Sequence, residues 1–348
     1  GRALEDGGNG RKGSNWFVFT GSYLRCLNCN RRQEKPFSSA PLYAGVEAAR
    51  PGVDPSGQEP PPAATNRPGP RSRPVHNIFF YVALPTSLDA LREEAQALTP
   101  RAHVPFSDAP TAAVLLLSDG TWVPGVRVES ASYSLTLPAL LNAYTTVVAT
   151  GRAADVDAFV LSRPFRREEA VYVEELPHGP FEAQAADVWL RGPTGADGTL
   201  PSPTDVLDPF LDATVDGEAD GIEQVRRLAE RAYVPSSHFP VSALLELDDG
   251  RLLPGVNVEH PDWARILCAE RNALGTAQSY SVGPGRRLFL SCPDDPEGTP
   301  CGACRQLLTE LAPDADLWMD RHDDAPEHAA PSSLLPGSFR GRALLDAR

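Results

Sequence analysis

Two short stretches of the sequence carry side chains that could do chemistry together. Cys268 and Glu270 stand two residues apart in "ILCAERNALGTA", in the first turn of a helix that we expect to start near Ala264. Further along, Cys301 and Cys304 open another helical pattern in "PCGACRQLLTEL". Residues at i and i+3 share one face of a helix, so these two thiols can hold one ion. A helix N-terminus favours negative charge and therefore supports thiolates, the form of cysteine that binds metal.

A zinc ion is the metal that this set of side chains favours. Three thiolates, from Cys268, Cys301 and Cys304, leave one corner of a zinc tetrahedron open, as in catalytic sites. Water at such a corner ionises near neutral pH. Glu270 lies close to the metal without needing to bind it, so its carboxylate can carry the proton of that water. We therefore predict one Zn²⁺ per chain and a catalytic role for Glu270.

The sequence pattern of the elements that must position these residues occurs twice in the chain. From Val104 and again from Val234, the sequence runs through a Val-Pro pair, a polar turn, an apolar strand, an Asp-Gly turn, a strand beginning at Pro-Gly-Val and a helix. Asp-Gly between two apolar runs is a strong hairpin signal. An amphipathic helical pattern precedes each copy, at 87–98 and 221–233. Because the register holds without a gap, we interpret the chain as a tandem duplication.

The N-terminal part differs from the two copies in composition. Residues 1–76 carry a net charge of +5, and eight prolines lie between Pro51 and Pro74. Such a segment buries too little apolar surface to offset the entropy lost on ordering, so we expect it to be disordered. Cys26 and Cys29 lie in it without a second pair nearby, so a zinc site there is only a minor alternative.

Charge and hydrophobicity exclude several classes of partner. The chain after residue 76 carries a net charge of −19. It therefore repels polyanions, and we expect no nucleic-acid polymer as a partner. The sequence has no apolar run long enough to cross a bilayer and no signal-peptide pattern, so we expect neither a membrane span nor secretion. Close cysteine pairs in such a chain suggest metal before disulfide.

The pattern C-A-E followed by P-C-x-x-C resembles the cytidine deaminase family, and the resemblance covers residues 222–340. "AYVPSSHFPVSALL" is similar to the opening segment of the family, which implies that Phe239 packs on a pyrimidine ring. "GVNVE" places Asn257 and Glu259 where the family binds ribose hydroxyls. "LLPGSF" is similar to the C-terminal segment of the family, which implies that Phe339 lines the pocket.

The resemblance also bears on the charge of the metal site. Three thiolates on Zn²⁺ leave a net negative charge, which a guanidinium that donates to a sulfur reduces. Arg271 and Arg305 are both candidates for this role. Arg271 matches the arginine of the C-A-E-R pattern in the family, so we favour it.

The first copy resembles the same family without its metal site. The residues aligned with C-A-E are Pro138, Ala139 and Leu140, and no P-C-x-x-C follows. Arg127 replaces the ribose-binding asparagine. With neither a ligand set nor an acid–base residue, this copy is expected to be pseudo-catalytic.

One loop departs from the family. The family usually reads E-N-A-S-Y or E-N-A-C-Y here, but the second copy has Glu259 followed by His260-Pro261-Asp262-Trp263. The first copy keeps Ala131 and Tyr133. In small oligomeric members of the family, this loop reaches into the active site of a neighbouring subunit. The resemblance thus implies that Ala131 and Tyr133 complete the substrate site of the second copy.

The resemblance implies an α/β fold with two tandem three-layer α/β/α cytidine deaminase-like domains, each with a mixed five-stranded sheet, after the disordered segment. We expect a pseudo-catalytic domain at 77–213 and a catalytic zinc-binding domain at 214–348. The implied reaction is hydrolytic deamination of cytidine and 2′-deoxycytidine to uridine and 2′-deoxyuridine, with release of ammonia, in cytoplasmic pyrimidine salvage. The expected assembly is a homodimer that imitates a four-unit arrangement, with a small nucleoside as the substrate.

Two other functions stay open at this point. The change at His260-Pro261-Asp262 leaves room for a deaminase of another nucleoside, or of a nucleoside antibiotic of the blasticidin type. A non-enzymatic nucleoside-binding or scaffolding protein is the second alternative, although the intact ligand set and Glu270 count against it. Cys292 is expected to be a core or loop residue, and His260 either an exposed loop residue or a substrate contact.

Overall fold

The computed structural model describes residues 17–20, 23–26, 86–192 and 200–346. The chain divides into two compact units, Gly1–Asn77 and Ile78–Arg348. In the first unit, β1 (Phe17–Thr20) and β2 (Tyr23–Cys26) pair as an antiparallel hairpin. The rest of the segment predicted to be disordered, including Cys29, lies outside the described residues. Both copies of the duplicated pattern belong to the second unit, while the expected boundary at 213/214 stays a prediction.

The first copy, hereafter the first repeat, forms one five-stranded sheet with three helices. Its elements are α1 (Thr86–Leu98), β3 (Ala112–Leu117), β4 (Trp122–Val126), α2 (Ala139–Ala149), β5 (Val156–Leu161), α3 (Arg167–Glu174), β6 (Phe181–Ala185) and β7 (Val188–Arg191). The strand order is β4-β3-β5-β7-β6, and neighbouring strands pair antiparallel. A single parallel bridge, between Trp122 and Val206, adds to the β4 edge.

The second repeat forms the other five-stranded sheet. Its elements are α4 (Gly217–Leu228), β8 (Ser242–Glu246), β9 (Leu252–Val256), α5 (Ala269–Ser279), β10 (Arg287–Ser291), α6 (Gly302–Leu311), β11 (Asp316–Met319), β12 (Glu327–Ala329), α7 (Pro331–Leu334) and α8 (Arg342–Asp346). The strand order is β12-β11-β10-β8-β9. Here β10 and β11 are parallel because α6 crosses over between them, whereas the first repeat ends in the β6–β7 hairpin. The predicted five-stranded sheets are confirmed.

The two Asp-Gly signals mark hairpin turns, as predicted. Asp119-Gly120 joins β3 to β4, and Asp249-Gly250 joins β8 to β9. Gly120 has a φ of 90° and Gly250 a φ of 85°, in the left-handed region that glycine adopts without strain. The turns hold each Pro-Gly-Val strand in register beside its partner.

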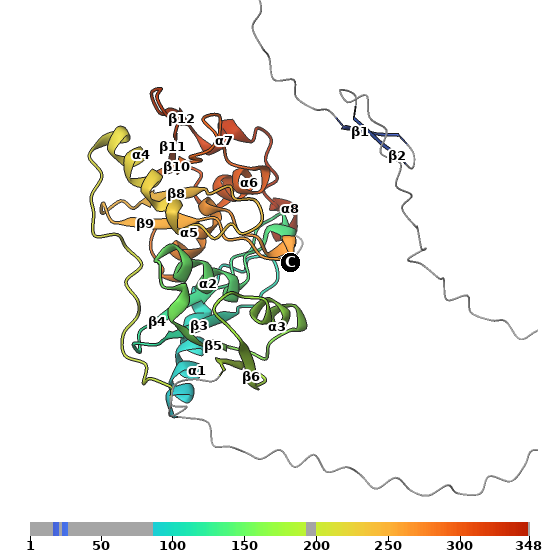
Figure 1. Ribbon diagram of the computed structural model, residues 1–348, viewed down its shortest axis with the longest axis vertical. Helices are drawn as coiled ribbons and strands as arrows, with labels where there is room; N and C mark the ends of the chain where they lie inside the picture. The colour runs from blue at the N-terminus through green and yellow to red at the C-terminus, as the bar shows by residue number, and fades with distance from the viewer. Residues whose placement is uncertain (1–16, 21–22, 27–85, 193–199, 347–348) are drawn as a thin grey trace, which may run out of the picture. The chain divides into compact units, whose positions relative to one another are not determined.

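Helices cover both faces of each sheet (Figure 1). α1 packs on one face of the first sheet and α4 on one face of the second, while α2 and α5 lie between the two sheets. All eleven residues of α2 are buried, as expected for a helix covered on every side. The layered α/β/α prediction is confirmed, and the two repeats share their middle layer. Within the described part of the chain, no helix is long and apolar enough to span a bilayer.

A glycine in each Pro-Gly-Val strand lets the following helix come close to the sheet. A Cβ at Gly125 would lie 2.2 Å from the carbonyl oxygen of Ala139, at the start of α2. A Cβ at Gly255 would lie 2.3 Å from the carbonyl oxygen of Ala269, at the start of α5. Any side chain at Gly255 would therefore push away the helix turn that carries the predicted site.

Reciprocal contacts join the two repeats. The hydroxyls of Thr146 and Thr276, at equivalent positions of α2 and α5, lie 2.8 Å apart. Arg101 of the first repeat donates to the carbonyl of Ser279 at 3.2 Å. Arg231, its equivalent in the second repeat, donates at 2.8 Å to the carbonyl of the residue that corresponds to Ser279. The two repeats are therefore related by an approximate two-fold rotation.

Candidate active site

The N-termini of α5 and α6 bring three sulfurs together. Cys268 is the N-cap residue of α5, Cys301 is the N-cap residue of α6, and Cys304 lies in the first turn of α6. The Sγ atoms of Cys268 and Cys301 are 3.7 Å apart, and those of Cys301 and Cys304 are 3.5 Å apart. The helix predicted to start near Ala264 starts instead at Ala269, because 263–265 form a separate 3₁₀ turn and the chain is extended between.

The spacing of the sulfurs fits a zinc ion. In a tetrahedron with Zn–S bonds of about 2.3 Å, two sulfurs lie roughly 3.8 Å apart. All three ligand atoms lie within 4.8 Å of one another, so closure around an ion needs only small shifts. Cys304 is buried while Cys301 is exposed, so the cluster opens toward solvent on one side. An ion held there would have three protein ligands and one position accessible to water.

The protonation of the thiols is shared across the cluster. Hydrogen bonding with Cys268 and Cys304 lowers the pKa of Cys301. The same hydrogen bonds, together with burial, raise the pKa of the Cys268 and Cys304 thiols. One thiolate thus forms readily, and the others lose their protons when a cation compensates the charge.

Glu270 lies in the first turn of α5 and is only 3% exposed. Burial raises the pKa of its carboxyl above the usual value, and the carboxyl also hydrogen-bonds with the side chain of Cys304. A carboxyl with a raised pKa beside a metal site can both take up and release a proton near neutral pH. The predicted acid–base residue thus lies against the sulfur cluster.

The two candidate arginines have different contacts. Arg271 Nη2 donates to the Ile266 carbonyl at 3.0 Å and approaches the Cys268 sulfur at 3.8 Å. Burial opposes the charge of Arg271, but the neighbouring sulfurs outweigh burial and raise its pKa. Arg305 instead donates to the Pro300 carbonyl at 2.8 Å. Arg271 is therefore the guanidinium placed to offset the charge of the thiolates.

The predicted base- and sugar-binding residues lie around one loop, the segment 235–241. Asn257 accepts a hydrogen bond from the Val241 N–H at 2.8 Å and donates to the Phe239 carbonyl at 2.9 Å. Phe239 is 37% exposed. Asn257 therefore fixes the backbone on both sides of Pro240, directly after the phenylalanine, a positioning role that the sequence pattern did not reveal.

Glu259 binds the N-terminal part of the same loop. Its carboxylate accepts hydrogen bonds from the N–H groups of Ser236 at 2.8 Å and Ser237 at 3.2 Å. Burial works against ionisation, but hydrogen bonds from the Ser237 hydroxyl and from the two N–H groups outweigh it and lower the pKa of Glu259. The carboxylate therefore stays charged at neutral pH.

A loop of the first repeat reaches α6 of the second repeat. Ser130 Oγ and the Ala131 N–H each donate to the carboxylate of Glu310 at 2.8 Å. Ala131 is buried there, whereas Tyr133 is 85% exposed. Gln306, one turn before Glu310 on α6, donates to Glu310. The structure thus brings Ala131 to the helix that carries two of the thiols, but it leaves the Tyr133 ring in solvent.

The C-terminal segment meets the same helix. Gln306 Nε2 also donates to the Phe339 carbonyl, and the Phe339 side chain is 54% exposed. A Cβ at Gly341 would lie 2.8 Å from the Cβ of Ala131, so this segment packs directly on the loop of the first repeat. Gln306 and the loop's partner Glu310 were absent from the sequence prediction. Their i, i+4 spacing is visible in the sequence, but their partners are distant in it.

The corresponding loop of the second repeat contacts the first repeat. His260 is buried at 5% exposure, and its ring stacks on Tyr172 of α3 with centroids 4.5 Å apart. His260 Nε2 also lies 3.3 Å from the Tyr172 carbonyl. Of the two alternatives for His260, an exposed loop residue is wrong because Tyr172 covers the ring, and a substrate contact stays a prediction.

Comparison with known proteins agrees with this geometry. Models of the cytidine and deoxycytidylate deaminase zinc-binding region match residues 218–317 and 75–164, one match in each repeat. A cytidine deaminase of Halalkalibacterium halodurans is 35% identical over 128 residues, which cover 36% of this chain and 96% of that protein. A cytidine deaminase of Mycobacterium tuberculosis is 40% identical over 113 residues, 32% of this chain and 80% of that protein.

A solved structure of cytidine deaminase from Burkholderia pseudomallei aligns with a TM-score of 0.34 at 31% identity, over 36% of this chain and all of that one. Because the curated relatives match over nearly their whole length and both repeats match the zinc-binding region, the chain belongs to the cytidine deaminase family, and only its second repeat retains the three thiols and Glu270.

Proposed function

We propose that this protein is a zinc-dependent deaminase that hydrolyses cytidine and 2′-deoxycytidine to uridine and 2′-deoxyuridine, with release of ammonia. The observation that carries the proposal is the buried Glu270 carboxyl beside three converging thiols. A closed structural site would have a fourth protein ligand and no use for a buried carboxyl. The relatives named cytidine deaminases support the choice of substrate.

The residues of the chain divide the reaction between them. When bound by the thiols, zinc would lower the pKa of a water molecule in its open position. Glu270 takes one proton from the attacking water and delivers it to N3 of the ring. It then moves the second proton to the amino group, so that C4 gains an oxygen and ammonia leaves. Arg271 offsets negative charge at the sulfurs throughout.

The substrate site is built on the loop 235–241 and the C-terminal segment. In our proposal Phe239 and Phe339 enclose the base, since both rings are partly exposed and neither fills the core. Asn257 and Glu259 hold the sugar. Each uses part of its capacity on backbone groups, but an amide and a carboxylate retain further donor or acceptor sites for hydroxyls. Substrate binding and loop position are therefore coupled.

Assembly and cellular role follow from the same features. We propose a homodimer in which Tyr133 of one chain reaches the active site of the other chain, because the Tyr133 side chain is 85% exposed in a single chain. Ala131, held against α6, supports the same site from the first repeat. We place the reaction in pyrimidine salvage in the cytoplasm, where a reducing environment keeps free thiols available for metal.

A nucleoside panel tests the function. Purified protein is incubated with cytidine, 2′-deoxycytidine, adenosine and a blasticidin-type nucleoside, and the loss of absorbance of each compound is followed. We expect conversion of the first two, and Glu270→Gln to lower kcat by at least ~10³-fold with zinc retained. Glu230→Gln, an exposed glutamate of the same repeat, is the control and should match the wild type. Zinc binding without conversion of any compound would favour a non-enzymatic binding protein.

A further inference from the structure

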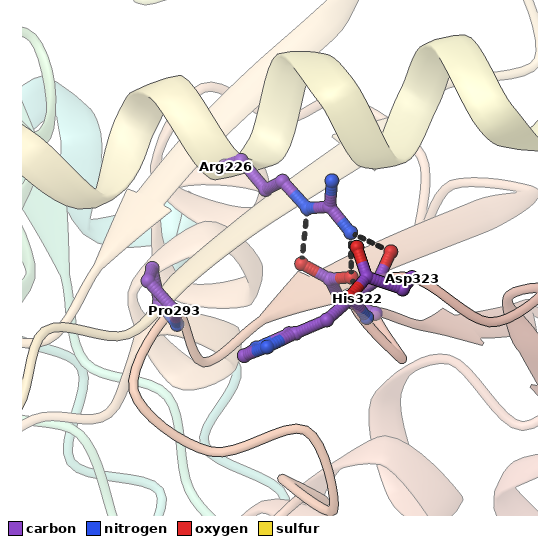
Figure 2. A pocket seen from close by; sticks show the side chains of 5 residues that line it. Arg226, Pro293, His322 and Asp323 are labelled. Atoms are coloured by element: carbon purple, nitrogen blue, oxygen red, sulfur yellow. Dashed lines mark hydrogen bonds and ion pairs between the residues drawn. The ribbon is translucent and has the colours of Figure 1, made fainter.

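The loop that leads to the metal ligands has no regular structure of its own. β10 ends at Ser291 and α6 begins at Gly302, so the position of Cys301 depends on how the chain between them is held. Arg226, Pro293, His322 and Asp323 line an open hollow beside the start of this loop (Figure 2). Side-chain packing therefore supports the loop poorly on that side, and hydrogen bonds must hold it.

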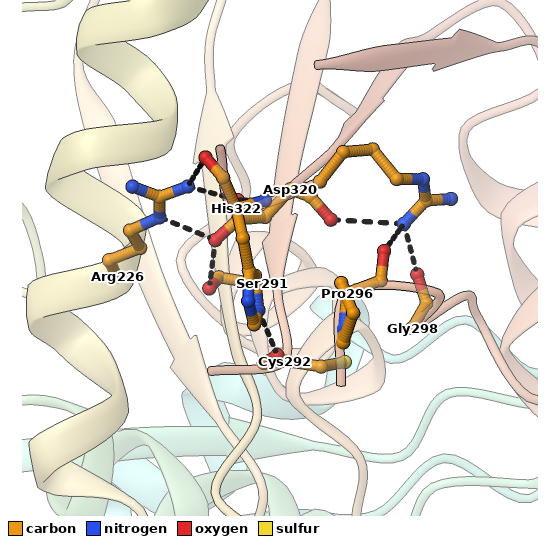
Figure 3. Close-up of polar contacts among 8 residues, drawn as sticks. Arg226, Ser291, Cys292, Pro296, Gly298, Asp320 and His322 are labelled. Carbon is orange, nitrogen blue, oxygen red and sulfur yellow. Dashed lines mark hydrogen bonds and ion pairs between the residues drawn. The ribbon is translucent and has the colours of Figure 1, made fainter. Parts of the chain in front are cut away.

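Arg321, the second residue after β11, supplies such bonds. Its Nη1 donates to the carbonyls of Gly298 at 2.9 Å and Pro296 at 3.2 Å, which lie shortly before Cys301 (Figure 3). A second arginine, Arg305 of α6, donates to the Pro300 carbonyl at 2.8 Å. Alternate carbonyls of the loop, those of residues 296, 298 and 300, thus accept hydrogen bonds from guanidinium groups, and the end of the loop is held immediately before the first ligand of α6.

Arg321 is itself fixed from the sheet. Its Nε and Nη2 both lie 2.8 Å from one carboxylate oxygen of Glu327 on β12, and the Arg321 side chain is only 14% exposed. A guanidinium has five donors in a rigid plane, so it can hold a carboxylate and two carbonyls at once. A lysine has a single ammonium and cannot reproduce this geometry.

The residues on either side of Arg321 hold the start of the loop. Asp320 accepts a hydrogen bond from the Ser291 hydroxyl at 2.8 Å and is paired with Arg226 of α4 (Figure 3). His322 Nε2 lies 3.2 Å from the carbonyl of Cys292. The three residues after β11 therefore touch the loop at both of its ends.

Comparison with the first repeat links the long loop and Arg321 to the presence of the metal ligands. Its chain passes from β5, ending at Leu161, to α3, starting at Arg167, by a much shorter path. No thiols stand at the start of α3, β6 follows that helix in the chain, and β7 lies beside β5 in the sheet, where β11 lies beside β10 in the second repeat. Among the described residues, the long loop and its arginine occur only in the repeat that carries the metal ligands.

We propose that Arg321 is a positioning residue for the metal site, which holds Cys301 in register with Cys268 and Cys304 through the carbonyls of Pro296 and Gly298. The inference rests on the proposed zinc site. Loss of the guanidinium frees the loop next to one of three ligands, so zinc should leave faster. The residues that we propose contact the sugar and the base lie on other elements, so the KM for cytidine should not change.

Zinc release to a chromogenic chelator, measured for Arg321→Gln, Arg321→Lys and wild type, tests the proposal. We expect Arg321→Gln to release zinc at least ~10-fold faster, as for other residues that orient metal ligands. Arg321→Lys should recover only part of the loss. Arg286→Gln removes a different ion-paired arginine beside the same sheet and should stay within about two-fold of wild type.

Thermal unfolding of the zinc-free proteins separates positioning from general stability. Arg321→Gln and Arg286→Gln should melt at similar temperatures without zinc and differ only in zinc release. The proposal would be overturned if Arg321→Gln released zinc at the wild-type rate. It would also be overturned if the melting temperature of zinc-free Arg321→Gln fell below that of zinc-free wild type in proportion to the faster zinc release. A wild type that binds no zinc would overturn both this inference and the proposed function. Normal zinc binding with an unaffected Arg321→Gln would remove the inference alone.

Discussion

The first turns of α3 and α6 occupy corresponding places in the two repeats but stabilise different charges. α6 begins after its N-cap residue Cys301 and has Cys304 in its first turn, whereas α3 begins after its N-cap residue Arg166 and has Glu169 at the position of Cys304. Glu169 accepts hydrogen bonds from the Arg166 N–H at 2.9 Å and from both terminal nitrogens of Arg163 at 2.8 and 2.6 Å. A metal-binding turn and a salt-bridged capping turn are thus alternative ways to fill one site.

The surroundings of Glu129 in the first repeat and of Glu259 in the second repeat differ in a more limited way. Glu129 of the first repeat accepts hydrogen bonds from the Phe106 and Ser107 N–H groups, as Glu259 does from its own loop. Arg127 adds an ion pair to Glu129 at 2.9 Å. The glutamate of the first repeat therefore keeps the loop-holding contacts, while Arg127 pairs with the carboxylate oxygen that we propose is used for the sugar in the second repeat.

Removing one thiol should have the largest effect on the difference between the repeats. Cys304→Ala leaves two ligands and should abolish zinc binding and lower kcat/KM by at least ~10³-fold. Cys292→Ala, a buried cysteine close in sequence, should keep zinc and activity. Metal content and cytidine turnover measure both, and full activity of Cys304→Ala would contradict the proposed site.

Breaking the ion pair of α3 should affect stability and leave catalysis unchanged. Glu169 is buried, so Glu169→Gln removes a charge that Arg163 needs and should lower the free energy of unfolding by about 2 kcal/mol. Urea denaturation measures the loss. Zinc content and kcat should equal those of wild type, and a fall in either would show that the salt-bridged turn of α3 affects the reaction.

Tyr133 and Trp263 offer a matched pair, because they occupy equivalent positions and are both 85% exposed. Tyr133→Ala should lower kcat/KM about tenfold with zinc content and folding unchanged, since we propose that Tyr133 completes an active site. Trp263 belongs to the loop whose His260 contacts the repeat without thiols, so Trp263→Ala should stay near wild type. Equal effects of the two variants would remove the division of labour between the loops.

One pH effect on stability, that of the Glu246 carboxylate, should have no counterpart in the first repeat. Glu246 of β8 is buried, and its equivalent in the first repeat is Leu116. Burial raises the pKa of Glu246, but Arg287 and Arg286 outweigh it and hold the pKa below its usual 4.5. The stabilisation is therefore complete above the unfolded pKa and is lost as pH falls through the folded pKa.

Glu246→Gln tests this effect. We expect it to be less stable than wild type at neutral pH by about 1 kcal/mol, and to lose less stability on acidification below about pH 4.5. Thermal melts across this range give the comparison. Parallel pH profiles of variant and wild type would rule out the contribution of Glu246.

Local signals in the sequence predicted the parts that depend on local chemistry. The Asp-Gly turns, the helices before each repeat and the thiol–carboxylate pattern each follow from residues close together in the chain. The start of α5 was misplaced because the extended stretch before Cys268 depends on pairing of Leu267 with Val258. The burial of His260 by Tyr172 and the hydrogen bonds from Arg321 to the loop before Cys301 depend on contacts between segments that are distant in the chain. Such contacts cannot be predicted from local patterns in a single sequence.

The seam between α2 and α5 has a consequence for how the duplicated chain can change. A single methyl group at Gly275 of α5 would lie 2.2 Å from the amide oxygen of Asn142 of α2, so the two helices mesh without spare room. The first repeat, which lacks the thiols, therefore supplies a surface that α5 of the second repeat needs for its own packing. We expect substitutions on the face of α2 that contacts α5 to be tolerated less well than substitutions on the exposed surface of the first repeat.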